Sequence, residues 1–567
     1  MSLFTLTGRW RQAARERDRR RADIAYGRVR LRWILRGFLL VYAAVVLKLL
    51  LFAVLPSDRF ARSGGSDTVA TARPDILDRN GEVLATDIKT ASLFAEPRKI
   101  IDVDEAAEAL AAALPELNPK EVRSRLASDK GFVWLKRELN ANQQAAVHRL
   151  GIPGIGFLPE NRRVYPMSRV ASHVLGHVNI DNQGIAGIEK HLDRDGLGAL
   201  HAAGFAIRNS ALAPVNLSLD MRVQFALRDE LAGAIERYKA KAALGVVLDV
   251  RTGEVLGMSS LPDYDPNDPK ESLDPNRMNR VSTGVFEMGS IFKSITVAMA
   301  IDAGRVKLTD SFDASQPLHY GRFTIHDYHA KRRALTVPEI FIYSSNIGTA
   351  RIAMTVGVEG QKAFLRKMGL LDRLRTELPE SGEPLFPKKW AEINLITIAF
   401  GHGISVSPLQ FASAASALVN GGLLIPPTFF PRSREEAAAL ATRVVRPETS
   451  EALRYLMRLN AEKGSAKRAD VPGYQVGGKT GTAEKVEHGH YSRNKLFTTF
   501  VATFPTDDPR YLVLVCLDEP NPATTGGVAT SAMNAAPATR GVIERIAPML
   551  GIAPSFATVA EGHASGL

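Results

Sequence analysis

The stretch "FEMGSIFKSITVAMAIDAG", Phe286 to Gly304, joins a polar start to a long apolar run. The run after Lys293 predicts a buried helix, and Gly304 is a typical residue at the end of one. Ser290 and Lys293 are three residues apart, so their side chains would lie on one helical face. A lysine in apolar surroundings has a lowered pKa and can act as the base that activates a serine. A lysine in a first helical turn can also extend to the solvent, and this stretch alone favours that simpler interpretation.

The positive charge of the chain is concentrated at its N-terminus. The 567 residues carry a net charge of +12, and residues 1–36 hold eleven Arg, no Lys and three acidic residues, a net +8. The rest of the chain therefore carries only +4. This distribution predicts a basic cytoplasmic tail and argues against a groove lined for phosphates, so no nucleic acid is expected as a partner.

A stretch long enough to cross a membrane follows the tail. Residues 37–55, "GFLLVYAAVVLKLLLFAVL", contain a single charge, and an apolar helix of about 20 residues spans a bilayer. The run is longer than the core of a cleaved signal peptide, and the arginines before it predict a cytoplasmic N-terminus with the bulk of the chain exported. Lys48 is expected either to extend toward the outer interface or to face a partner helix, and both interpretations stay open.

The exported part divides into a linker, two folded regions and a tail. Residues 56–72 are polar and contain glycine, as a juxtamembrane linker should. Residues 73–210 predict a smaller α+β module that begins with a hairpin at Asn80-Gly81. In residues 211–552, strands come first, a mostly helical middle follows and strands come last, which predicts an α+β domain with an antiparallel sheet packed against a helical lobe. Residues 553–567 predict a disordered tail.

Several conspicuous polar residues are not expected to form sites. Cys516 is the single cysteine and lies in the apolar run "YLVLVCLDEP", which predicts a buried structural residue. His488 and His490 lie in "VEHGHYSRNK", which predicts a polar loop rather than a metal site. The charged segments "ENRRVYP" (160–166) and "GIAGIEKHLD" (184–193) are interpreted as solvated faces. No metal ion and no cofactor are expected.

Residues 211–552 contain three short motifs whose order along the chain is informative. Ser-x-x-Lys occurs twice, at Ser290/Lys293 and at Ser492/Lys495. Ser-x-Asn also occurs twice, at Ser344–Asn346 and at Ser492–Asn494. Lys-Thr-Gly occurs once, at Lys479–Gly481. The copies at 492–495 are attributed to chance because they lie in the predicted polar loop. Ser344 follows Ser290 by 54 residues in apolar surroundings, and Lys479 follows Ser344 by 135 residues, just before the last strands.

This order of motifs is the signature of penicillin-binding proteins and serine β-lactamases. The chain resembles the class B (monofunctional) penicillin-binding transpeptidases, and within them the division-specific septal enzymes. The resemblance covers nearly the whole chain, through the basic tail, the single anchor and the segments "RPDILDRNGEVLA", "RRVYP", "GIAGIE", "LPDYDPNDP", "FEMGSIFK", "SSN", "FGHGISVSPLQFASAASALVNGG" and "GGKTGTAEK". Met288 departs from it, because many relatives have proline before the Gly-Ser, and is expected to tune the loop rather than the chemistry. The resemblance implies a penicillin-binding/serine β-lactamase-like transpeptidase domain preceded by a pedestal module of the dimerisation type.

The resemblance also implies the residues of the acylation step. Ser290 attacks the carbonyl between the two terminal D-alanines of a peptidoglycan stem peptide, and Lys293 is its base. Backbone N–H groups of Ser290 and Thr482 hold the developing oxyanion, and the helix dipole adds to this at Ser290. Ser344 relays a proton between Lys293 and the leaving amine.

A second group of residues is implied to bind the substrate. Asn346 donates to an amide carbonyl of the stem peptide. Lys479 supplies positive charge for the terminal carboxylate, and the hydroxyls of Thr480 and Thr482 hydrogen-bond it. Gly481 allows another backbone to approach the strand closely.

By the same resemblance the protein is a single-pass protein of the cytoplasmic (inner) membrane, with its catalytic domain in the periplasm, at the division septum. The implied partners are stem peptides ending in D-Ala-D-Ala, lipid-linked or nascent glycan, β-lactam antibiotics, a membrane glycan polymerase and other division proteins.

Other functions compete with this one. A β-lactamase needs a deacylating water and its base and is commonly a soluble secreted domain, and a β-lactam sensor ordinarily needs more membrane segments or a signalling domain. A bifunctional enzyme needs a glycan polymerase domain larger than residues 73–210. A DD-carboxypeptidase, a lateral-wall transpeptidase and a β-lactam-binding scaffold stay open as alternatives.

Overall fold

The computed structural model describes residues 36–37, 39–43, 45, 73–194, 212–321, 323–487 and 490–556. The chain divides into two compact units, residues 1–67 and 68–567. In the first unit, the described residues are helical. Within the described ranges, no helix combines the length and the apolar character needed to span a membrane. Lys48 and most of the predicted span 37–55 fall outside these ranges, as do the predicted linker 56–72 and most of the predicted tail 553–567.

The second unit begins with the predicted hairpin. β1 (Ile76–Leu77) and β2 (Val83–Ala95) pair antiparallel across a turn in which Gly81 has a φ of +89°. The Asp78 carboxylate accepts the backbone N–H of Asn80 at 2.7 Å, a local bond typical of such turns. The hairpin at Asn80-Gly81 is therefore confirmed.

A small α+β module is built around β2. From Thr86 to Ala95 this strand pairs antiparallel with β4 (Ile155–Val164), and near its end it also pairs with β3 (Val133–Leu139). Three helices share an apolar core with these strands: α2 (Val103–Ala113), α3 (Pro119–Leu126) and α4 (Ala141–His148). The short elements α5 (Ser172–Leu175), α6 (Gly187–Leu192) and β5 (Val215–Asn216) follow, and β5 pairs parallel with β1.

A buried charged cluster corrects one expectation from the sequence. The Glu189 carboxylate accepts the Nε of Arg73 at 2.8 Å and the Nε of Arg163 at 2.7 Å, and all three side chains are fully buried. The Tyr165 hydroxyl donates to the same carboxylate at 3.2 Å. Charges withdrawn from water are held only when they are paired. The interpretation of segments 160–166 and 184–193 as solvated faces is therefore wrong at Arg163, Tyr165 and Glu189, which are buried and paired within the protein.

The larger part of the second unit is built on a five-stranded sheet in the order β14-β15-β16-β6-β7, with every neighbouring pair antiparallel. Along β6, Leu244 and Val246 face one apolar core while Ala243 and Val247 face another, so both faces of the sheet are covered. β14 forms one edge. The strands are β6 (Ala242–Asp249), β7 (Val255–Leu261), β14 (Gly477–Glu487), β15 (His490–Phe504) and β16 (Tyr511–Asp518). The predicted antiparallel sheet is confirmed.

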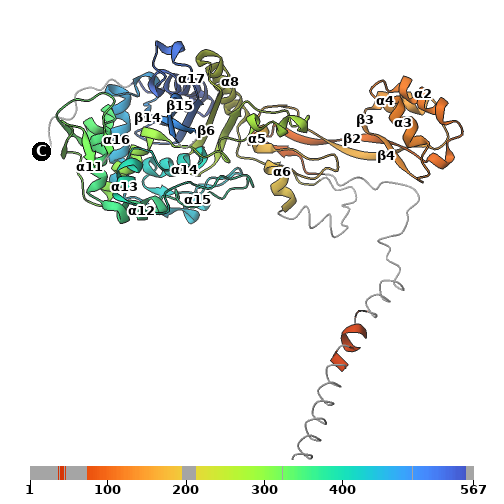
Figure 1. Ribbon diagram of the computed structural model, residues 1–567, viewed down its shortest axis with the longest axis horizontal. Helices are drawn as coiled ribbons and strands as arrows, with labels where there is room; N and C mark the ends of the chain where they lie inside the picture. The colour runs from red at the N-terminus through yellow and green to blue at the C-terminus, as the bar shows by residue number, and fades with distance from the viewer. Residues whose placement is uncertain are drawn as a thin grey trace, which may run out of the picture. The chain divides into compact units, whose positions relative to one another are not determined.

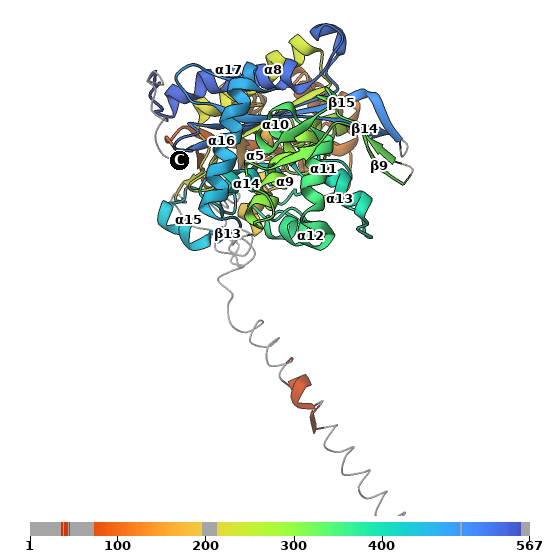
Figure 2. The ribbon, with the colours of Figure 1, turned by 90° about the vertical axis from the view of Figure 1, so that its left-hand side faces the viewer.

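Helices cover the two faces. Figure 1 and Figure 2 show α8 (Met221–Tyr238) and α17 (Ala535–Met549) together on one side of the sheet, and a helical lobe on the other. The lobe contains α9 (Lys293–Asp302), α10 (Val337–Tyr343), α11 (Asn346–Met354), α12 (Gly357–Lys367), α13 (Glu392–Ala399), α14 (Pro408–Val419), α15 (Arg434–Leu440) and α16 (Pro447–Lys463). Short strands accompany it: β8 (Ser311–Asp313), β9 (Leu318–Tyr320), β10 (Phe323–Ile325), β11 (Ala334–Thr336), β12 (Leu423–Leu424) and β13 (Thr442–Arg443). The mostly helical middle is thereby confirmed.

α9 is the buried helix predicted from the opening stretch. Its residues from Lys293 to Ala300 are all buried. Gly304 has a φ of +66° and its N–H bonds the carbonyl of Ile301 at 3.0 Å. The N–H of Arg305 bonds the carbonyl of Ala300 at 3.0 Å, which completes a Schellman ending. The predicted end of this helix at Gly304 is confirmed.

The predicted polar loop at 486–495 is wrong over its described residues. β14 and β15 stay paired out to Glu487 and His490, with an irregular register after Glu484. The second motif copies at 492–495 therefore lie within β15, and His488 lies outside the described residues. Pairing with a neighbouring strand outweighs the polar composition of this segment.

Cys516 lies on β16 and is fully buried. Burial raises the pKa of its thiol well above the ordinary value, which keeps it protonated and unreactive. The predicted structural role is confirmed. Among the described residues, no three His, Cys, Asp or Glu side chains are grouped so as to hold a metal ion.

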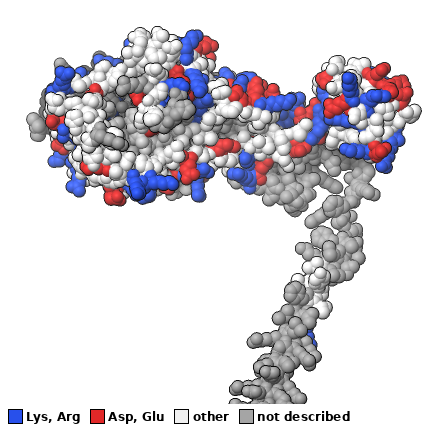
Figure 3. Space-filling model, in the orientation of Figure 1, with Lys and Arg blue, Asp and Glu red and all other residues white. Residues whose placement is uncertain are grey.

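Surface charge on the described part of the chain is mixed. Figure 3 shows Lys and Arg side chains interspersed with Asp and Glu side chains over one face. Local ion pairs such as Arg125 with Glu121 contribute to this pattern.

Candidate active site

The turn that carries Ser290 precedes the α-helix instead of opening it. Residues Gly289–Phe292 form a 3-10 turn that runs directly into α9, which begins at Lys293. Gly289 has a φ of +56°, and a Cβ atom there would lie 2.7 Å from the carbonyl oxygen of Thr482. The helix therefore starts later than predicted, because the chain must first pass closely over β14 in a conformation that favours glycine.

Lys293 is buried, with 1% of its surface exposed. Its Nζ donates to the carbonyl oxygen of Ser344 and, at 3.1 Å, to the Oγ of the same residue. Burial lowers the pKa of Lys293 well below the ordinary value, the charge of Lys479 lowers it further, and Asp327 acts in the opposite direction. The alternative in which this lysine extends to the solvent is therefore wrong, and a low-pKa amine is available as a base.

Ser344 lies at the junction of two helices. It caps the end of α10 with a φ of +57° and a ψ of 43°, a left-handed conformation that costs energy for any residue with a Cβ. The following residue, Ser345, caps the start of α11. This geometry places the Ser344 hydroxyl between the Nζ atoms of Lys293, at 3.1 Å, and Lys479, at 2.9 Å. Strained backbone of this kind is often found at functional positions.

Lys479 reaches the same hydroxyl from β14. Its side chain is fully buried, and its Nζ lies 5.7 Å from the centre of the Phe341 ring. Burial lowers the pKa of Lys479 to about 7. In the part of the chain that the structure describes, neither Lys479 nor Lys293 forms an ion pair with a carboxylate, so a positive charge here is available to an anionic ligand.

The environments of the two lysines separate their protonation states. Burial accounts for the lowered pKa of Lys479, whereas Lys293 is lowered by burial and also by the charge of Lys479. Two ammonium groups bonded to one hydroxyl repel each other, so the loss of one proton from the pair is favoured. The site can therefore hold a neutral amine beside a charged one, which provides a base and an anion-binding group at the same time.

Asp327 orders the Ser-Ser-Asn segment, and the sequence analysis did not single it out. One of its carboxylate oxygens accepts the Ser345 hydroxyl at 2.7 Å and the other accepts the N–H of Ile347 at 3.0 Å. A carboxylate at the start of a helix is favourable. The Nδ2 of Asn346 donates to the carbonyl of His326 at 3.0 Å, so the same loop holds Asn346. No motif in the sequence signals Asp327, which lies in a polar segment between short strands.

The hydroxyls of Thr480 and Thr482 already have partners within the protein. The Oγ1 of Thr480 is hydrogen-bonded to the Oγ of Ser465 at 2.7 Å, and the Oγ1 of Thr482 accepts the N–H of Ser531 at 3.2 Å. Both contacts fix the orientation of these side chains on the edge strand. A hydroxyl held in this way can still accept or donate a further hydrogen bond to a ligand.

Packing within the protein itself requires a glycine at position 481, whereas the sequence suggested only the close approach of a substrate backbone. A Cβ atom at this position would lie 2.3 Å from the Oγ1 of Thr499 and 2.6 Å from the carbonyl oxygen of Met288. That carbonyl accepts the Thr499 hydroxyl at 3.0 Å. The backbone that approaches Gly481 closely is therefore the segment before the Ser290 turn. Met288 itself is fully buried.

The structure brings the three motifs together. The Ser344 hydroxyl joins Lys293 to Lys479, and the turn that carries Ser290 packs against Thr482. Ser290 is partly exposed, and its hydroxyl makes no hydrogen bond to any described residue. A serine, a buried amine, a bridging hydroxyl and a cation at an edge strand are the components of acyl transfer through a covalent intermediate.

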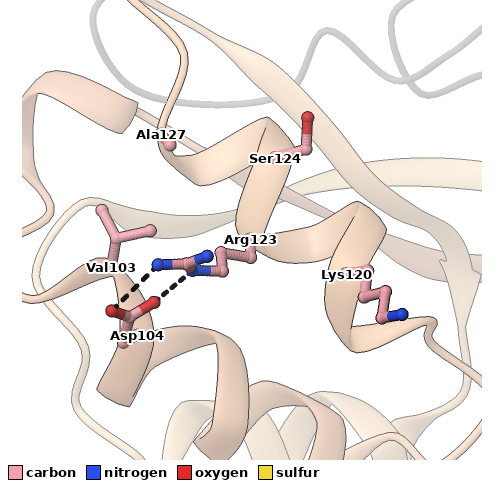
Figure 4. A pocket seen from close by; sticks show the side chains of 6 residues that line it. All are labelled: Val103, Asp104, Lys120, Arg123, Ser124 and Ala127. Atoms are coloured by element: carbon pink, nitrogen blue, oxygen red, sulfur yellow. Dashed lines mark hydrogen bonds and ion pairs between the residues drawn. The ribbon is translucent and has the colours of Figure 1, made fainter.

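The surface of the described residues has two hollows, one beside this site and one on the smaller module. One of about 280 Å³ adjoins the Ser-Ser-Asn segment, lined by Ala314, Ser315, Gln316, Pro317, His326, Asp327, Ala330, Arg332 and Ile347. Another, of about 430 Å³, lies on the smaller module and is lined by Val103, Asp104, Lys120, Arg123, Ser124 and Ala127. Figure 4 shows Arg123 turned toward Asp104, with which it forms an ion pair. Lys120 and Ser124 both line this second hollow, but no hydrogen bond joins their side chains as one joins Lys293 to Ser344.

Comparison with known proteins places both folded parts in one family. Residues 243–538 match the penicillin-binding protein transpeptidase domain, and residues 68–196 match the penicillin-binding protein dimerisation domain. The chain is 41% identical over 509 residues to the probable peptidoglycan D,D-transpeptidase FtsI of Caulobacter vibrioides, covering 87% of this chain and 84% of that protein. It is 30% identical to the peptidoglycan D,D-transpeptidase FtsI of Escherichia coli, covering 82% of each.

A solved structure agrees in fold. Penicillin-binding protein 3 of Mycobacterium tuberculosis, determined in complex with aztreonam, superposes with a TM-score of 0.66 at 24% identity, covering 86% of this chain and 98% of that one. At this identity the likeness concerns the fold. The matched domains and the identity to the relatives lead to one conclusion: the chain belongs to the FtsI-type class B penicillin-binding proteins, a family of transpeptidases.

Proposed function

We propose that this protein is the septal peptidoglycan D,D-transpeptidase of its cell and that it works through an acyl-enzyme on Ser290. The observation that carries the mechanism is the meeting of two buried lysines on the Ser344 hydroxyl, beside the turn that holds Ser290. The substrate is a stem peptide ending in D-Ala-D-Ala, and the names of the FtsI relatives support this substrate class.

The acylation step uses the low-pKa amine. Neutral Lys293 takes the proton of the Ser290 hydroxyl as the serine oxygen attacks the carbonyl between the two terminal D-alanines. The oxyanion that forms is held by the backbone N–H groups of Ser290 and Thr482, a role supported by the close packing of Gly289 on Thr482. As the C–N bond breaks, the proton passes through Ser344 to the leaving amine, and D-alanine departs.

The second step releases the enzyme. An amine of a neighbouring stem peptide attacks the ester carbonyl, its proton passes to Lys293, and the Ser290 oxygen regains a proton as the ester bond breaks. A new amide bond is thereby formed, which is the cross-link. If water took the place of the amine, the enzyme would act as a DD-carboxypeptidase, so the acceptor decides between these two outcomes.

Substrate binding is assigned to the edge strand and to the Ser-Ser-Asn segment. Lys479, with Thr480 and Thr482, is proposed to hold the terminal carboxylate, since its ammonium group has no carboxylate partner among the described residues. Asn346 is proposed to donate to an amide carbonyl. Gly481 keeps the strand close to the Ser290 turn. β-Lactam antibiotics are proposed to acylate Ser290 in place of the peptide.

The cellular setting rests on the N-terminal sequence. We propose a cytoplasmic tail over residues 1–36, a single membrane span over 37–55 in the inner membrane and a periplasmic catalytic domain at the septum. A membrane glycan polymerase and other division proteins are the proposed partners, and Lys48 is a candidate contact in the span. Replacing Lys48 with Leu should reduce co-purification with the polymerase, and unchanged recovery would rule this contact out.

Labelling with a fluorescent penicillin tests the acyl-enzyme. The full chain, purified in detergent, should form a stable adduct that survives denaturation, and Ser290→Ala should form none. Ser492→Ala is the matched control, because Ser492 belongs to the other Ser-x-x-Lys copy, and it should label like the parent. Absence of label on a folded parent would leave a scaffold role as the better explanation, and rapid loss of label with drug hydrolysis would indicate a β-lactamase.

Depletion in cells separates the septal from the lateral-wall role. Loss of a septal enzyme should block division and give filaments, whereas loss of a lateral-wall enzyme should give rounded cells. Rescue by the parent gene and not by the Ser290→Ala form would assign the phenotype to the reaction.

A further inference from the structure

A partly buried carboxylate lies three residues before Ser290 and joins three separate segments. The Oε1 of Glu287 accepts the backbone N–H of Gly403 at 2.8 Å and the hydroxyl of Tyr491 at 3.0 Å. Gly403 belongs to the loop between α13 and α14, and Tyr491 lies at the start of β15. One oxygen atom therefore ties the start of the serine turn to a loop and to the β14–β15 hairpin.

The loop that Glu287 holds is pressed against the serine turn. A Cβ atom at Gly401 would lie 2.1 Å from the carbonyl oxygen of Gly289. Gly289 in turn packs on the backbone of Thr482. The turn is thus enclosed between the edge strand on one side and the loop on another, and a shift of the loop must move the residue that precedes Ser290.

His402, between the two glycines of the loop, completes the contact with the hairpin. Its ring meets those of Phe400 and Tyr491 at centroid distances of 5.4 and 5.7 Å. Burial lowers the pKa of His402 to about 4. The imidazole is therefore neutral at physiological pH and packs as an aromatic ring.

The environment of Glu287 points to hydrogen-bond acceptance rather than to charge. Its second oxygen, Oε2, is buried and has no partner among the described residues. Burial raises the pKa of the Glu287 carboxyl above its ordinary value. Both bonds to Gly403 and Tyr491 end on Oε1, and a neutral carboxyl or an amide offers the same acceptor oxygen.

We propose that Glu287 is a positioning residue for the transpeptidase reaction: by holding Gly403 and Tyr491 on a single oxygen, it keeps the glycine loop against Gly289 and so aims Ser290. This inference rests on the proposed role of Ser290 as the nucleophile. It assigns to Glu287 no contact with the substrate and no proton transfer. Its consequence is a maximal acylation rate that depends on an acceptor oxygen at position 287.

Stopped-flow acylation of the full chain by a fluorescent penicillin tests the proposal, since its concentration dependence separates the maximal rate, k2, from the dissociation constant, Kd. Glu287→Ala should lower k2 by about 10- to 100-fold, because small displacements of a reacting group have effects of that size, and should leave Kd nearly unchanged. Glu287→Gln keeps the acceptor oxygen and should recover most of the lost rate. Tyr491→Phe removes one of the two bonds and should lower k2 about fivefold.

A matched control comes from the same domain. Glu377 is another partly buried carboxylate that accepts one hydroxyl, of Thr428 at 2.6 Å, and one backbone N–H, of Phe429 at 3.0 Å. Glu377→Ala removes the same kinds of contact away from the serine turn and should leave k2 within about twofold of the parent, since k2 follows the alignment of the reacting groups.

The outcomes are distinguishable. If the parent is not acylated, the proposed function fails; if the parent is acylated and Glu287→Ala keeps its k2, only the positioning role fails. Loss of k2 in Glu287→Gln equal to that in Glu287→Ala would overturn the proposal by showing that the charge matters. Should Glu287→Ala not fold, Tyr491→Phe decides, and a k2 equal to the parent's would overturn the proposal.

Discussion

The side-chain nitrogens of Lys293 and Lys479 meet on one oxygen, the hydroxyl of Ser344, at 3.1 and 2.9 Å. The two lysines come from a helix and from an edge strand, and both are buried. Burial lowers the pKa of each lysine, and their proximity disfavours a state in which both carry a charge. The pair thus combines a base with a cation, and several measurable consequences arise from it.

Acylation should depend on pH in a bell-shaped manner. The second-order constant for a fluorescent penicillin should rise with pH as Lys293, whose pKa is lowered, becomes neutral and able to accept a proton. It should fall as pH passes about 7, where Lys479 loses the charge that holds the carboxylate. Measurement from about pH 5 to about pH 9 covers both limbs. In Lys479→Ala the constant should be low and the falling limb absent, and a parent constant that keeps rising beyond pH 7 would contradict this assignment.

Ser344 offers a test that separates its hydroxyl from its backbone. Ser344→Ala and Ser344→Gly both remove the oxygen between the lysines, and each should reduce k2 by about 100-fold or more, the usual scale for lost proton transfer. Glycine accepts the φ of +57° without strain, so Ser344→Gly should be more stable than Ser344→Ala by about 1 kcal/mol. Thermal unfolding and penicillin labelling, run on both variants, measure the two effects. Full activity in either variant would exclude the hydroxyl from the reaction.

Gly289 should be intolerant of a side chain, unlike a glycine with similar backbone angles nearby. Gly289→Ala forces a Cβ atom to within 2.7 Å of Thr482, so it should displace the serine turn and lower k2 by about 100-fold. Gly304→Ala is the control, because Gly304 also has a positive φ but has open space around it. It should cost only about 1 kcal/mol of stability and keep the parent's k2. Equal kinetic effects in the two variants would contradict the packing argument.

The buried cluster around Glu189 predicts a large stability effect away from the active site. Glu189→Leu leaves the guanidinium groups of Arg73 and Arg163 without their shared carboxylate, which should cost about 3–5 kcal/mol. Glu121→Leu, which breaks a solvent-exposed pair with Arg125, should cost less than about 1 kcal/mol. Urea unfolding of the two variants gives the comparison. A similar midpoint for both would mean that the cluster contributes little.

Much of the architecture was predictable because local patterns carry it. The apolar run after Lys293 and the glycine at 304 predicted α9 and its end, and the apolar strands around Cys516 predicted the sheet. The start of α9 was not predictable in the same way. It depends on how closely the turn at Gly289 passes over Thr482, a contact between segments far apart in the chain.

The residues of the site also fall into two groups, those that motifs predict and those that only tertiary contacts bring in. Motif order predicted Ser290, Lys293, Ser344 and Lys479 as site residues, but no motif position marks Asp327 or Glu287. The bond between Glu287 and Tyr491 joins residues 204 positions apart, and hydrogen bonds of this kind leave no periodic trace along the chain. The strand pairing within 486–495 was missed for a related reason, since the polar residues of β15 become a strand only by pairing with β14.

The sequence by itself determined which side chains are available for a reaction, because hydroxyls, amines and carboxylates bring their chemistry wherever they lie. Only the tertiary structure decided what state they are in. Lys293 could have extended into water with an ordinary pKa, and its burial beside Lys479 is what lowers that pKa. Desolvation and the distance between charges are properties of packed segments, and no stretch of sequence contains them until the chain has folded.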